Sequence, residues 1–243
     1  MSHFRPILLG IAIALSLGYM AWALFVSDTQ HGSTVCQAFD IIVADSVRQT
    51  FVSTEDIRRQ VAINGMEPQG RTMDEIDTDN IEKIVYNNPM IREAQCYKTN
   101  GSHVRLVLYQ RTPKLRVMGP RNYYVDTDRQ LMPTSTNYAA YVHVVTGLTD
   151  HTLAQTDIYD FVDYIDNDDF WNAQIEQIIV HPDTTIDIVP RVGNHILRLG
   201  KLERYRQKLD KAMVLYQKGF SIIGWPDYKI IDLRFRNQII CKK

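Results

Sequence analysis

The sequence has little of what an enzyme or a metal protein needs. Its 243 residues include only three cysteines, with no CxxC pair and no cluster of cysteine and histidine, so a zinc site is not expected. The seven histidines are scattered, and none stands at a metal-ligand spacing from a second histidine or a cysteine. The GxSxG, HExxH, Walker A and GxGxxG motifs are all missing. The sequence therefore predicts no catalytic residue, no cofactor, no metal and no small-molecule substrate.

The three cysteines, Cys36, Cys96 and Cys241, also argue against a disulfide framework, because their number is odd. A bridge between Cys36 and Cys96 is compatible with an oxidising compartment. Three buried free thiols are the other interpretation, and the sequence leaves both open.

Positive charge is missing from one long stretch of the sequence. Between Gln130 and Pro190 there is no lysine or arginine but ten acids, whereas Arg191 to Lys243 carries thirteen bases against four acids. The two segments either offset each other within one domain or contact a partner or anionic lipid, and the role of the acidic 150–187 segment stays open. The net charge of -1 gives no signal for nucleic acid. The Asp163–Asp169 run lacks the glycine of a calcium loop, so a solvated helix face is favoured.

One long hydrophobic run is present. Ile7–Val26 contains 20 residues without a charge, and a helix of that length spans about 30 Å, the thickness of a bilayer core. Arg5 precedes the run and Asp28 follows it. The positive-inside rule then predicts a cytoplasmic tail at 1–6, a transmembrane helix at 7–26 and a body outside the cytoplasm.

A cleaved signal peptide is the competing interpretation, since Ala21–Ala23 resembles a small-x-small cleavage site. The apolar run is longer than the usual h-region of roughly 7–15 residues, and Trp22 and Leu24 crowd the site. We therefore expect an uncleaved, single-pass anchor in the inner membrane, followed by a linker at 27–35.

The next segment, 36–112, reads as a small α+β domain in the order strand, helix, helix, strand, strand. Ser53 is a helix cap, with Asp56 completing a capping box, and Asp77 or Thr78 caps the second helix. Asn100 and Gly101 predict a type I′ hairpin turn. The expected strands and helices are Ala38–Ala44, a helix from Ser53, Asp79–Asn87, Ile91–Lys98 and His103–Arg111.

From 113 to 243 the pattern changes to strands and turns with two helices, Thr156–Phe170 and Lys201–Lys218, the latter ending at Gly219. The expected strands are Leu115–Met118, Asn122–Val125, Tyr141–Val145, Gln174–His181, Thr184–Val189, His195–Leu199 and Lys229–Cys241. In the last of these, apolar and polar residues alternate, which is typical of a sheet edge with one wet face.

The whole plan resembles the bacterial FtsQ/DivIB division family, with a POTRA domain before the FtsQ-type β domain. The resemblance is carried by Phe51–Ile57, by Ile81–Ile84 with Asn88–Ala94, by Tyr109–Pro113, by Tyr124–Asp128, by Leu199 and Gly200, and by Ile231–Phe235. Gln110 and Arg129 depart from the family's usual acid and glycine, and the 66–77 loop is longer than the usual helix link. The Pro190–His195 segment resembles Bacteroidetes-type members.

That resemblance implies a non-enzymatic divisome scaffold at the septum, which binds FtsB–FtsL by strand addition at its C-terminal edge strand. The implied partner-binding residues are Ile230, Asp232, Arg234, Phe235, Arg236 and Gln238. A second contact surface is expected at Gln95, Tyr97 and Lys98. The alternatives are a POTRA-type chaperone module of another envelope assembly system, and an exported enzyme.

Overall fold

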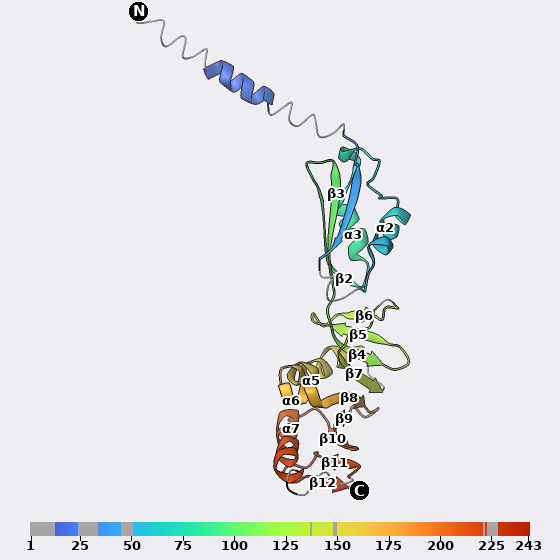
Figure 1. The fold of residues 1–243 in the computed structure, drawn as a ribbon, viewed down its shortest axis with the longest axis vertical. Coiled ribbons are helices and arrows are strands. Elements are labelled where there is room, and N and C mark those ends of the chain that lie inside the picture. The colour runs from blue at the N-terminus through green and yellow to red at the C-terminus, as the bar shows by residue number, and fades with distance from the viewer. Residues whose placement is uncertain are drawn as a thin grey trace, which may run out of the picture. The chain divides into compact units, whose positions relative to one another are not determined.

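The computed structural model describes residues 13–23, 34–44, 51–136, 138–147, 150–220, 222 and 228–243. The chain divides into two compact units between Gln110 and Arg111, which we call unit 1 and unit 2 and describe separately (Figure 1). Both mix helices and strands, so the predicted α+β class is confirmed.

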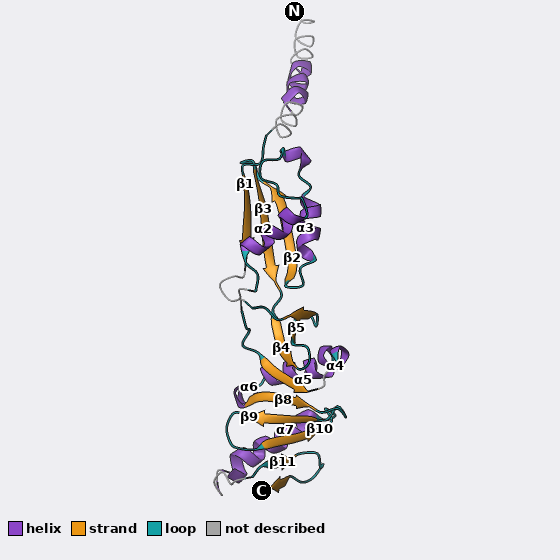
Figure 2. Ribbon diagram, turned by 90° about the vertical axis from the view of Figure 1, so that its right-hand side faces the viewer, coloured by secondary structure: helices purple, strands orange, loops and turns teal. Residues whose placement is uncertain are grey.

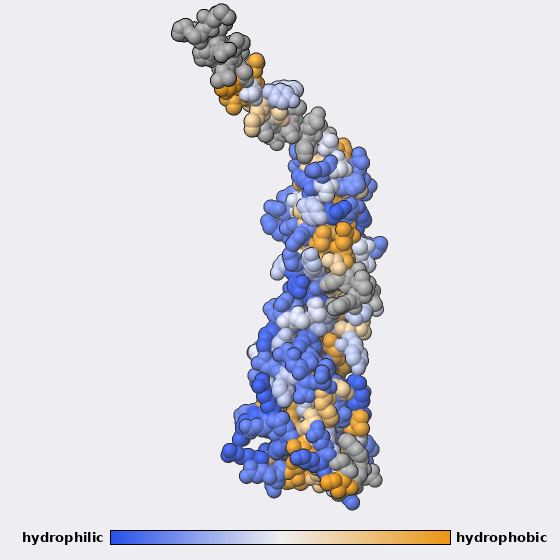
Figure 3. All heavy atoms as spheres, turned by 60° about the vertical axis from the view of Figure 1, so that its left-hand side comes forward, coloured by the Kyte–Doolittle hydropathy of each residue, from blue (hydrophilic) through white to orange (hydrophobic). Residues whose placement is uncertain are grey.

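The first described segment, residues 13–23, is helical and displays its apolar side chains. Leu15 is 70% exposed and Trp22 is 61% exposed, and Figure 3 shows orange apolar atoms on this segment. The predicted transmembrane helix extends past it at both ends, into 7–12 and 24–26, which lie outside the described residues, as does most of the predicted linker. Within the described part of the chain, no helix is long and apolar enough to span a bilayer.

Unit 1 is a three-stranded sheet covered on one face by two helices (Figure 2). Its elements follow the predicted order: β1 (Ala38–Val43), α2 (Thr54–Ile63), a 3₁₀ helix (Met73–Glu75), α3 (Thr78–Tyr86), β2 (Ile91–Lys98) and β3 (His103–Gln110). The strands lie in the order β1-β3-β2, with β1 parallel to β3 and β2 antiparallel to it. Strands β1 and β2 therefore form the two edges of this sheet.

The helices of unit 1 begin where their caps predict. The Ser53 hydroxyl accepts a hydrogen bond from the Asp56 amide at 3.1 Å, and the Asp77 carboxylate accepts one from the Asn80 amide at 3.0 Å. Each cap satisfies an amide that has no partner within its own helix. The faces turned to the sheet are fully buried, at Ile57 and Val61 in α2 and at Ile81 and Val85 in α3.

The hairpin between β2 and β3 differs from the prediction. Its left-handed residue is Ser102, with φ of 58°, and neither Asn100 nor Gly101 has a positive φ. The Thr99 amide donates to the His103 carbonyl across the turn at 2.9 Å. The connection is therefore a three-residue loop closed by a left-handed residue, and the expected two-residue type I′ turn is wrong.

The long 66–77 loop lies against the chain that precedes β1. The Cys36 amide donates to the Arg71 carbonyl at 2.8 Å, and the Gly70 amide donates to the Cys36 carbonyl at 3.0 Å. The Met73 amide donates to the Thr34 carbonyl, so three backbone hydrogen bonds hold the loop to residues 34–36.

The cysteines are free thiols. Cys36 and Cys96 are both buried, and burial raises the pKa of Cys96 to about 12.

Unit 2 is built on nine described strands. These are β4 (Pro113–Met118), β5 (Tyr123–Asp126), β6 (Leu131–Pro133), β7 (His143–Gly147), β8 (Ile175–Val180), β9 (Ile186–Pro190), β10 (Ile196–Gly200), β11 (Ile230–Asp232) and β12 (Ile240–Lys242). They lie side by side in the order β12-β11-β10-β9-β8-β7-β4-β5-β6. In the middle, β4, β7 and β8 are parallel, so their carboxyl ends meet at one border of the sheet.

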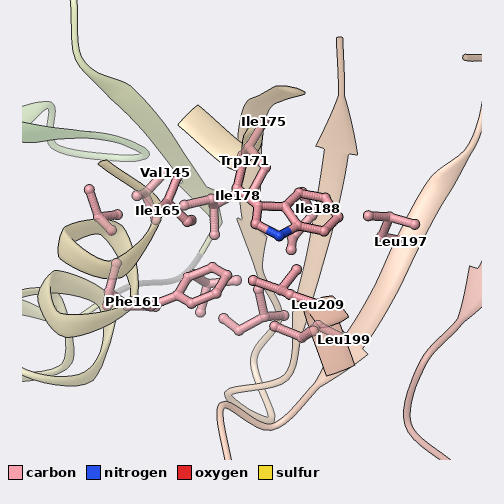
Figure 4. Packing of buried hydrophobic residues seen from close by; sticks show 14 of the residues in the cluster. Val145, Phe161, Ile165, Trp171, Ile175, Ile178, Ile188, Leu197, Leu199 and Leu209 are labelled. Atoms are coloured by element: carbon pink, nitrogen blue, oxygen red, sulfur yellow. The ribbon is translucent and has the colours of Figure 1, made fainter. Parts of the chain in front are cut away.

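The helices of unit 2 cover one face of this sheet (Figure 1). Figure 4 shows the packing: Phe161 and Ile165 of the helical layer meet Ile178 and Ile188 of the strands, with Trp171 beside them. All five side chains are at most 1% exposed. Burying a large apolar side chain contributes roughly 1.5–3 kcal/mol, so this layer is the main source of stability in the unit.

The structure divides the two helices predicted for unit 2. The first, expected at Thr156–Phe170, becomes α5 (Asp157–Asp166) and α6 (Asp169–Gln174), and it is preceded by α4 (His151–Gln155), which was not predicted from the sequence. The division follows from Asp168, which caps α6 by accepting hydrogen bonds from the amides of Phe170 and Trp171. Asp150 caps α4 in the same way, by accepting from the Leu153 amide. Short β6 was also missing from the prediction, because three residues carry too little periodicity.

The second predicted helix begins later and ends differently. It runs as α7 (Tyr205–Val214) and continues as a π-helix over Leu215–Phe220. Gly219 lies inside the π-helix, so it is not the C′ residue that the sequence suggests. A methyl group at Gly219 would approach Leu215 Cδ1 to 2.9 Å, which gives the glycine a packing reason instead.

The predicted terminal strand, Lys229–Cys241, is also wrong as a single element. It forms β11 and β12, which pair antiparallel, with residues 233–239 between them. Asp232 accepts a hydrogen bond from the Arg234 amide at 3.1 Å, which turns the chain out of the strand direction. Ile231 and Leu233 are buried as the alternation predicts, but Asp232 is also buried and Phe235 is 41% exposed.

Candidate protein-interaction site

The end of the large sheet in unit 2 is strand β12. Within the described chain β12 pairs with β11 alone, whereas β11 lies between β10 and β12. The backbone of β11, including Ile230 and Asp232, is therefore already paired on both sides. At this end of the sheet an added strand can pair with β12, so the edge predicted for 229–241 is confined to residues 240–242, while β6 forms the other end of the sheet.

Asp232 organises the turn that leads to this edge. Its carboxylate is 1% exposed and accepts hydrogen bonds from the Arg234 guanidinium, at 2.9 Å from Nε and 2.6 Å from Nη2. Burial by itself would raise the pKa of Asp232. The hydrogen bonds from Arg234 and the charges of Arg234 and Arg198 outweigh burial and lower that pKa. Asp232 is thus an ionised support for Arg234.

A second support comes from the chain beneath Arg234. Gly200 has φ of 73°, and a Cβ placed on it would lie 2.8 Å from Arg234 Cγ. Only glycine fits both the left-handed backbone and this close contact. The Arg234 guanidinium lies 6.0 Å from the centre of the Phe235 ring, and both side chains are exposed.

The same turn is tied to α7. The Lys211 ammonium donates to the carbonyls of Leu233 and Phe235. Arg236 and Gln238 follow, both exposed. The structure therefore brings together four of the predicted partner-binding residues, Arg234, Phe235, Arg236 and Gln238, on one turn. Ile230 and Asp232 stand behind them in the sheet.

A basic hollow of about 270 Å³ lies between α7 and this turn. Among the described residues that line it, none is acidic and five are basic: Arg204, Lys208, Lys211, Arg234 and Arg236. Burial, and after it the charge of Arg204, lower the pKa of both Lys208 and Lys211. Arg234 is paired with Asp232, but the other four bases form no ion pair with a described residue, so the hollow favours an acidic partner.

Sequence reasoning did not place Lys211, Arg204 and Lys208 in this site, because the sequence does not show that their helix packs beside the C-terminal turn. Their signal was the excess of bases after Arg191, whose position the sequence alone did not give. Gly200 was visible in the family resemblance, but its contact with Arg234 joins residues 34 positions apart.

The second predicted surface, Gln95, Tyr97 and Lys98, lies on edge strand β2 of unit 1, where all three side chains are exposed. The edge is partly closed between them. The amide of Cys96 donates to Glu82 Oε1 of α3 at 2.6 Å, so this backbone group is already satisfied. On the opposite edge, Arg58 of α2 donates to the Phe39 carbonyl of β1 at 2.6 Å.

The acidic run at 163–169 is used structurally. Asp163 and Asp166 each lie 2.8 Å from the Lys114 ammonium, and Asp168 caps α6. Across the described residues, no group of three or more histidine, cysteine or acidic side chains is arranged to hold a metal ion.

A βααββ unit followed by a larger mixed sheet with an open edge strand defines a two-domain protein whose first domain is of the POTRA type. Residues 34–109 match the family model described as a POTRA-like domain. Residues 112–242, more than half of the chain, match the model described as FtsQ/DivIB, C-terminal related. The chain belongs to the FtsQ/DivIB family, whose members are non-enzymatic division proteins. A comparison with curated proteins finds no match.

Proposed function

We propose that the chain is a non-enzymatic divisome scaffold of the bacterial inner membrane, which links early and late division proteins at the septum. Its N-terminal helix, 7–26, anchors it, with the N-terminus in the cytoplasm and both units in the periplasm. The exposure of Leu15, Leu17 and Trp22 on helix 13–23 supports an apolar surrounding for this segment, because such side chains are costly to leave in water.

The observation that carries the proposal is the open edge at β12 beside the basic hollow. A segment of the FtsB–FtsL pair adds to β12 through main-chain hydrogen bonds. Arg234 and Arg236 attract acidic side chains of that segment, and Phe235 contributes apolar area. Asp232 and Ile230 act behind them, since Asp232 fixes the Arg234 guanidinium and Ile230 belongs to the strand on which β12 rests.

A proline scan of β12 tests strand addition. In a strand, successive amides point to opposite sides, so proline at Ile240, Cys241 and Lys242 in turn samples both the side facing β11 and the open side. At a position whose amide points outward, proline removes one hydrogen bond to the partner and weakens FtsB–FtsL binding by about threefold to tenfold, with thermal stability unchanged. At an inward position, stability falls instead.

Arg236→Ala and Lys243→Ala form a matched pair that tests how much positive charge in the basic hollow contributes to FtsB–FtsL binding. Both remove an exposed base, but only Arg236 lines the basic hollow. We expect weaker FtsB–FtsL binding for the first variant alone. If all three proline variants and Arg236→Ala retain wild-type affinity in a pull-down, strand addition at this edge is wrong.

Localisation with depletion tests the broader role. A fluorescent fusion of the full chain is expected to form a septal band, and depletion is expected to give filamentous cells. Uniform envelope staining with normal division and a loss of assembled outer-membrane proteins would instead support the chaperone-module alternative.

A further inference from the structure

A second hollow in unit 2, of about 420 Å³, has the opposite charge to the basic one. It lies where the start of α5 meets the connection between β10 and α7. Its lining includes the apolar side chains Ile158 and Ile186, both fully buried, and the partly buried Leu202. The charged groups that line it are Asp157, Asp160, Glu203 and Lys201. The hollow thus combines an apolar floor with a mainly acidic rim.

The acids on this rim are not equally available. Asp160 is paired with Arg129 at 2.5 Å, and Arg129 also lies over the Tyr159 ring. Asp157 and Glu203 are exposed, and neither forms an ion pair with any residue that the structure describes. Asp157 and Glu203 therefore place two carboxylates at this hollow against the single ammonium of Lys201, and although the charge of Glu203 also acts on Lys208, an excess of negative charge remains.

The acidic hollow continues into a larger neighbour. A hollow of about 680 Å³ shares Leu153 and Thr184 with it as walls. Gly119 and Gly147 also line this neighbour, so it lies at the carboxyl ends of β4 and β7. Crevices at the carboxyl ends of parallel strands are common binding places, because the chain leaves the sheet there in different directions.

One buried hydroxyl group beside the larger hollow forms no hydrogen bond within the described chain. Tyr123, 8% exposed, lines this hollow, and its hydroxyl has no hydrogen-bond partner in the described part. The His151 ring packs edge-on against Tyr123, with 4.8 Å between ring centroids. Buried hydroxyls are nearly always paired in folded proteins, so this one is available to a ligand.

We propose that the two joined hollows bind an extended peptide segment of another protein, with a lysine or arginine side chain seated in the acidic hollow. A basic side chain has an aliphatic stem that suits the floor at Ile158 and Ile186, and a cationic head that suits Asp157 and Glu203. The flanking residues of the segment occupy the neighbour beside Tyr123. The two hollows are continuous across Leu153 and Thr184, which fits an extended peptide better than a small amine.

This contact is separate from the proposed FtsB–FtsL contact. The two hollows lie on different sides of the connection at residues 201–204, because Arg204 lines the basic hollow and Glu203 lines the acidic hollow. The basic hollow selects acidic side chains, and the acidic hollow selects basic ones. Either contact can fail without the other.

The test uses the purified full chain in detergent micelles and the peptide acetyl-Gly-Leu-Lys-Leu-Gly-amide. The same peptide with norleucine or glutamate in the central position isolates the charge. We expect the lysine peptide to bind most tightly, with an affinity that falls as salt rises. The double variant Asp157→Asn, Glu203→Gln should weaken binding by roughly fivefold, and Lys201→Gln should strengthen it.

Two controls separate this result from a general charge effect and from the other site. Glu176→Gln removes an exposed acid on β8 outside the hollow, and Arg236→Ala alters the basic hollow without unpairing Asp232. Both should bind the lysine peptide as wild type does. Equal affinities for the lysine and norleucine peptides would overturn the proposal, and so would wild-type affinity in the folded double variant.

Discussion

Gly200 and Arg234 form a contact in which the absence of one side chain makes room for the other. The Arg234 stem lies over Gly200, where a Cβ would be 2.8 Å from Arg234 Cγ. We predict that Gly200→Ala lowers the free energy of unfolding by about 1–2 kcal/mol, because alanine is strained in the left-handed backbone conformation of this position. The added methyl group should also displace Arg234.

Urea denaturation and a pull-down with FtsB–FtsL check this prediction. Gly65→Ala is the matched control, because Gly65 has a similar φ of 71° but nothing within 4 Å of the added methyl group. Gly65→Ala should lose stability without losing partner binding. Equal binding by both variants would show that the position of Arg234 does not matter to the partner.

The second prediction concerns the pH dependence that Asp232 confers. Its pKa in the folded protein is lowered, because hydrogen bonds from Arg234 outweigh burial. Its contribution to stability is therefore present above the unfolded pKa of about 3.9 and is lost as the pH falls through the folded pKa. At pH 7, Asp232→Asn should lower the free energy of unfolding by about 1–3 kcal/mol.

Below about pH 4 the difference between wild type and Asp232→Asn should shrink, because the Asp232 carboxylate becomes protonated first in the unfolded chain and, at lower pH, in the folded protein. Thermal unfolding at pH 3, 4 and 7 measures it. A difference that stays constant across this range would mean that the ionised form of Asp232 is not what stabilises the turn.

The third prediction concerns the closed edge of unit 1. Glu82→Ala removes the acceptor of the Cys96 amide, which leaves a backbone donor open on β2. We expect a loss of about 1–3 kcal/mol in the free energy of unfolding, together with concentration-dependent self-association in gel filtration. Glu75→Ala, an exposed acid in the 3₁₀ helix, is the control and should change neither.

The fourth prediction tests the second contact surface. Gln95→Asp combined with Lys98→Asp changes exposed side chains on β2, so stability should move by no more than about 0.5 kcal/mol. Septal recruitment of a fluorescent fusion should decrease. Lys83→Asp on α3 is the control for charge reversal, and a double variant that localises normally would remove this surface from the proposal.

The fifth prediction tests the anchor. Leu15→Arg should cost about 2.5–3.5 kcal/mol of membrane insertion and shift part of the protein into the carbonate-extractable fraction. Leu15→Phe should stay in the membrane. Mass spectrometry is expected to find the unprocessed N-terminus, and a mature N-terminus near Leu24 would support the signal-peptide alternative.

Local signals predicted much of unit 1, since its helices begin at Ser53 and Asp77, whose side chains cap the residues that follow. Periodicity likewise predicted a helix over the residues of α5. The errors have two causes: short-range hydrogen bonds to Asp168 and Asp232 begin or end elements where periodicity would continue them, and contacts from distant residues hold the turns that result. The break between β11 and β12 depends on Lys211, which reaches the turn from another element.

The candidate site was predicted only in part, because some of its residues come together from distant parts of the sequence. Arg234 and Phe235 could be found by resemblance, because the segment around them is continuous in sequence. The basic hollow could not, since Arg204 and Lys208 meet that segment only after α7 packs on the sheet. The acidic hollow likewise joins α5 to the chain after β10, about 45 residues further on.

The π-helix at Leu215–Phe220 has an evolutionary consequence. A π-helical turn holds one residue more than an α-helical turn, so it is equivalent to an α-helix that has gained a single residue. It sets the hydroxyl of Tyr216 at 2.6 Å from Nε2 of the buried His195. Relatives that lack the extra residue should carry a one-residue gap between 215 and 220, an uninterrupted α-helix, and a different pair of residues in place of His195 and Tyr216.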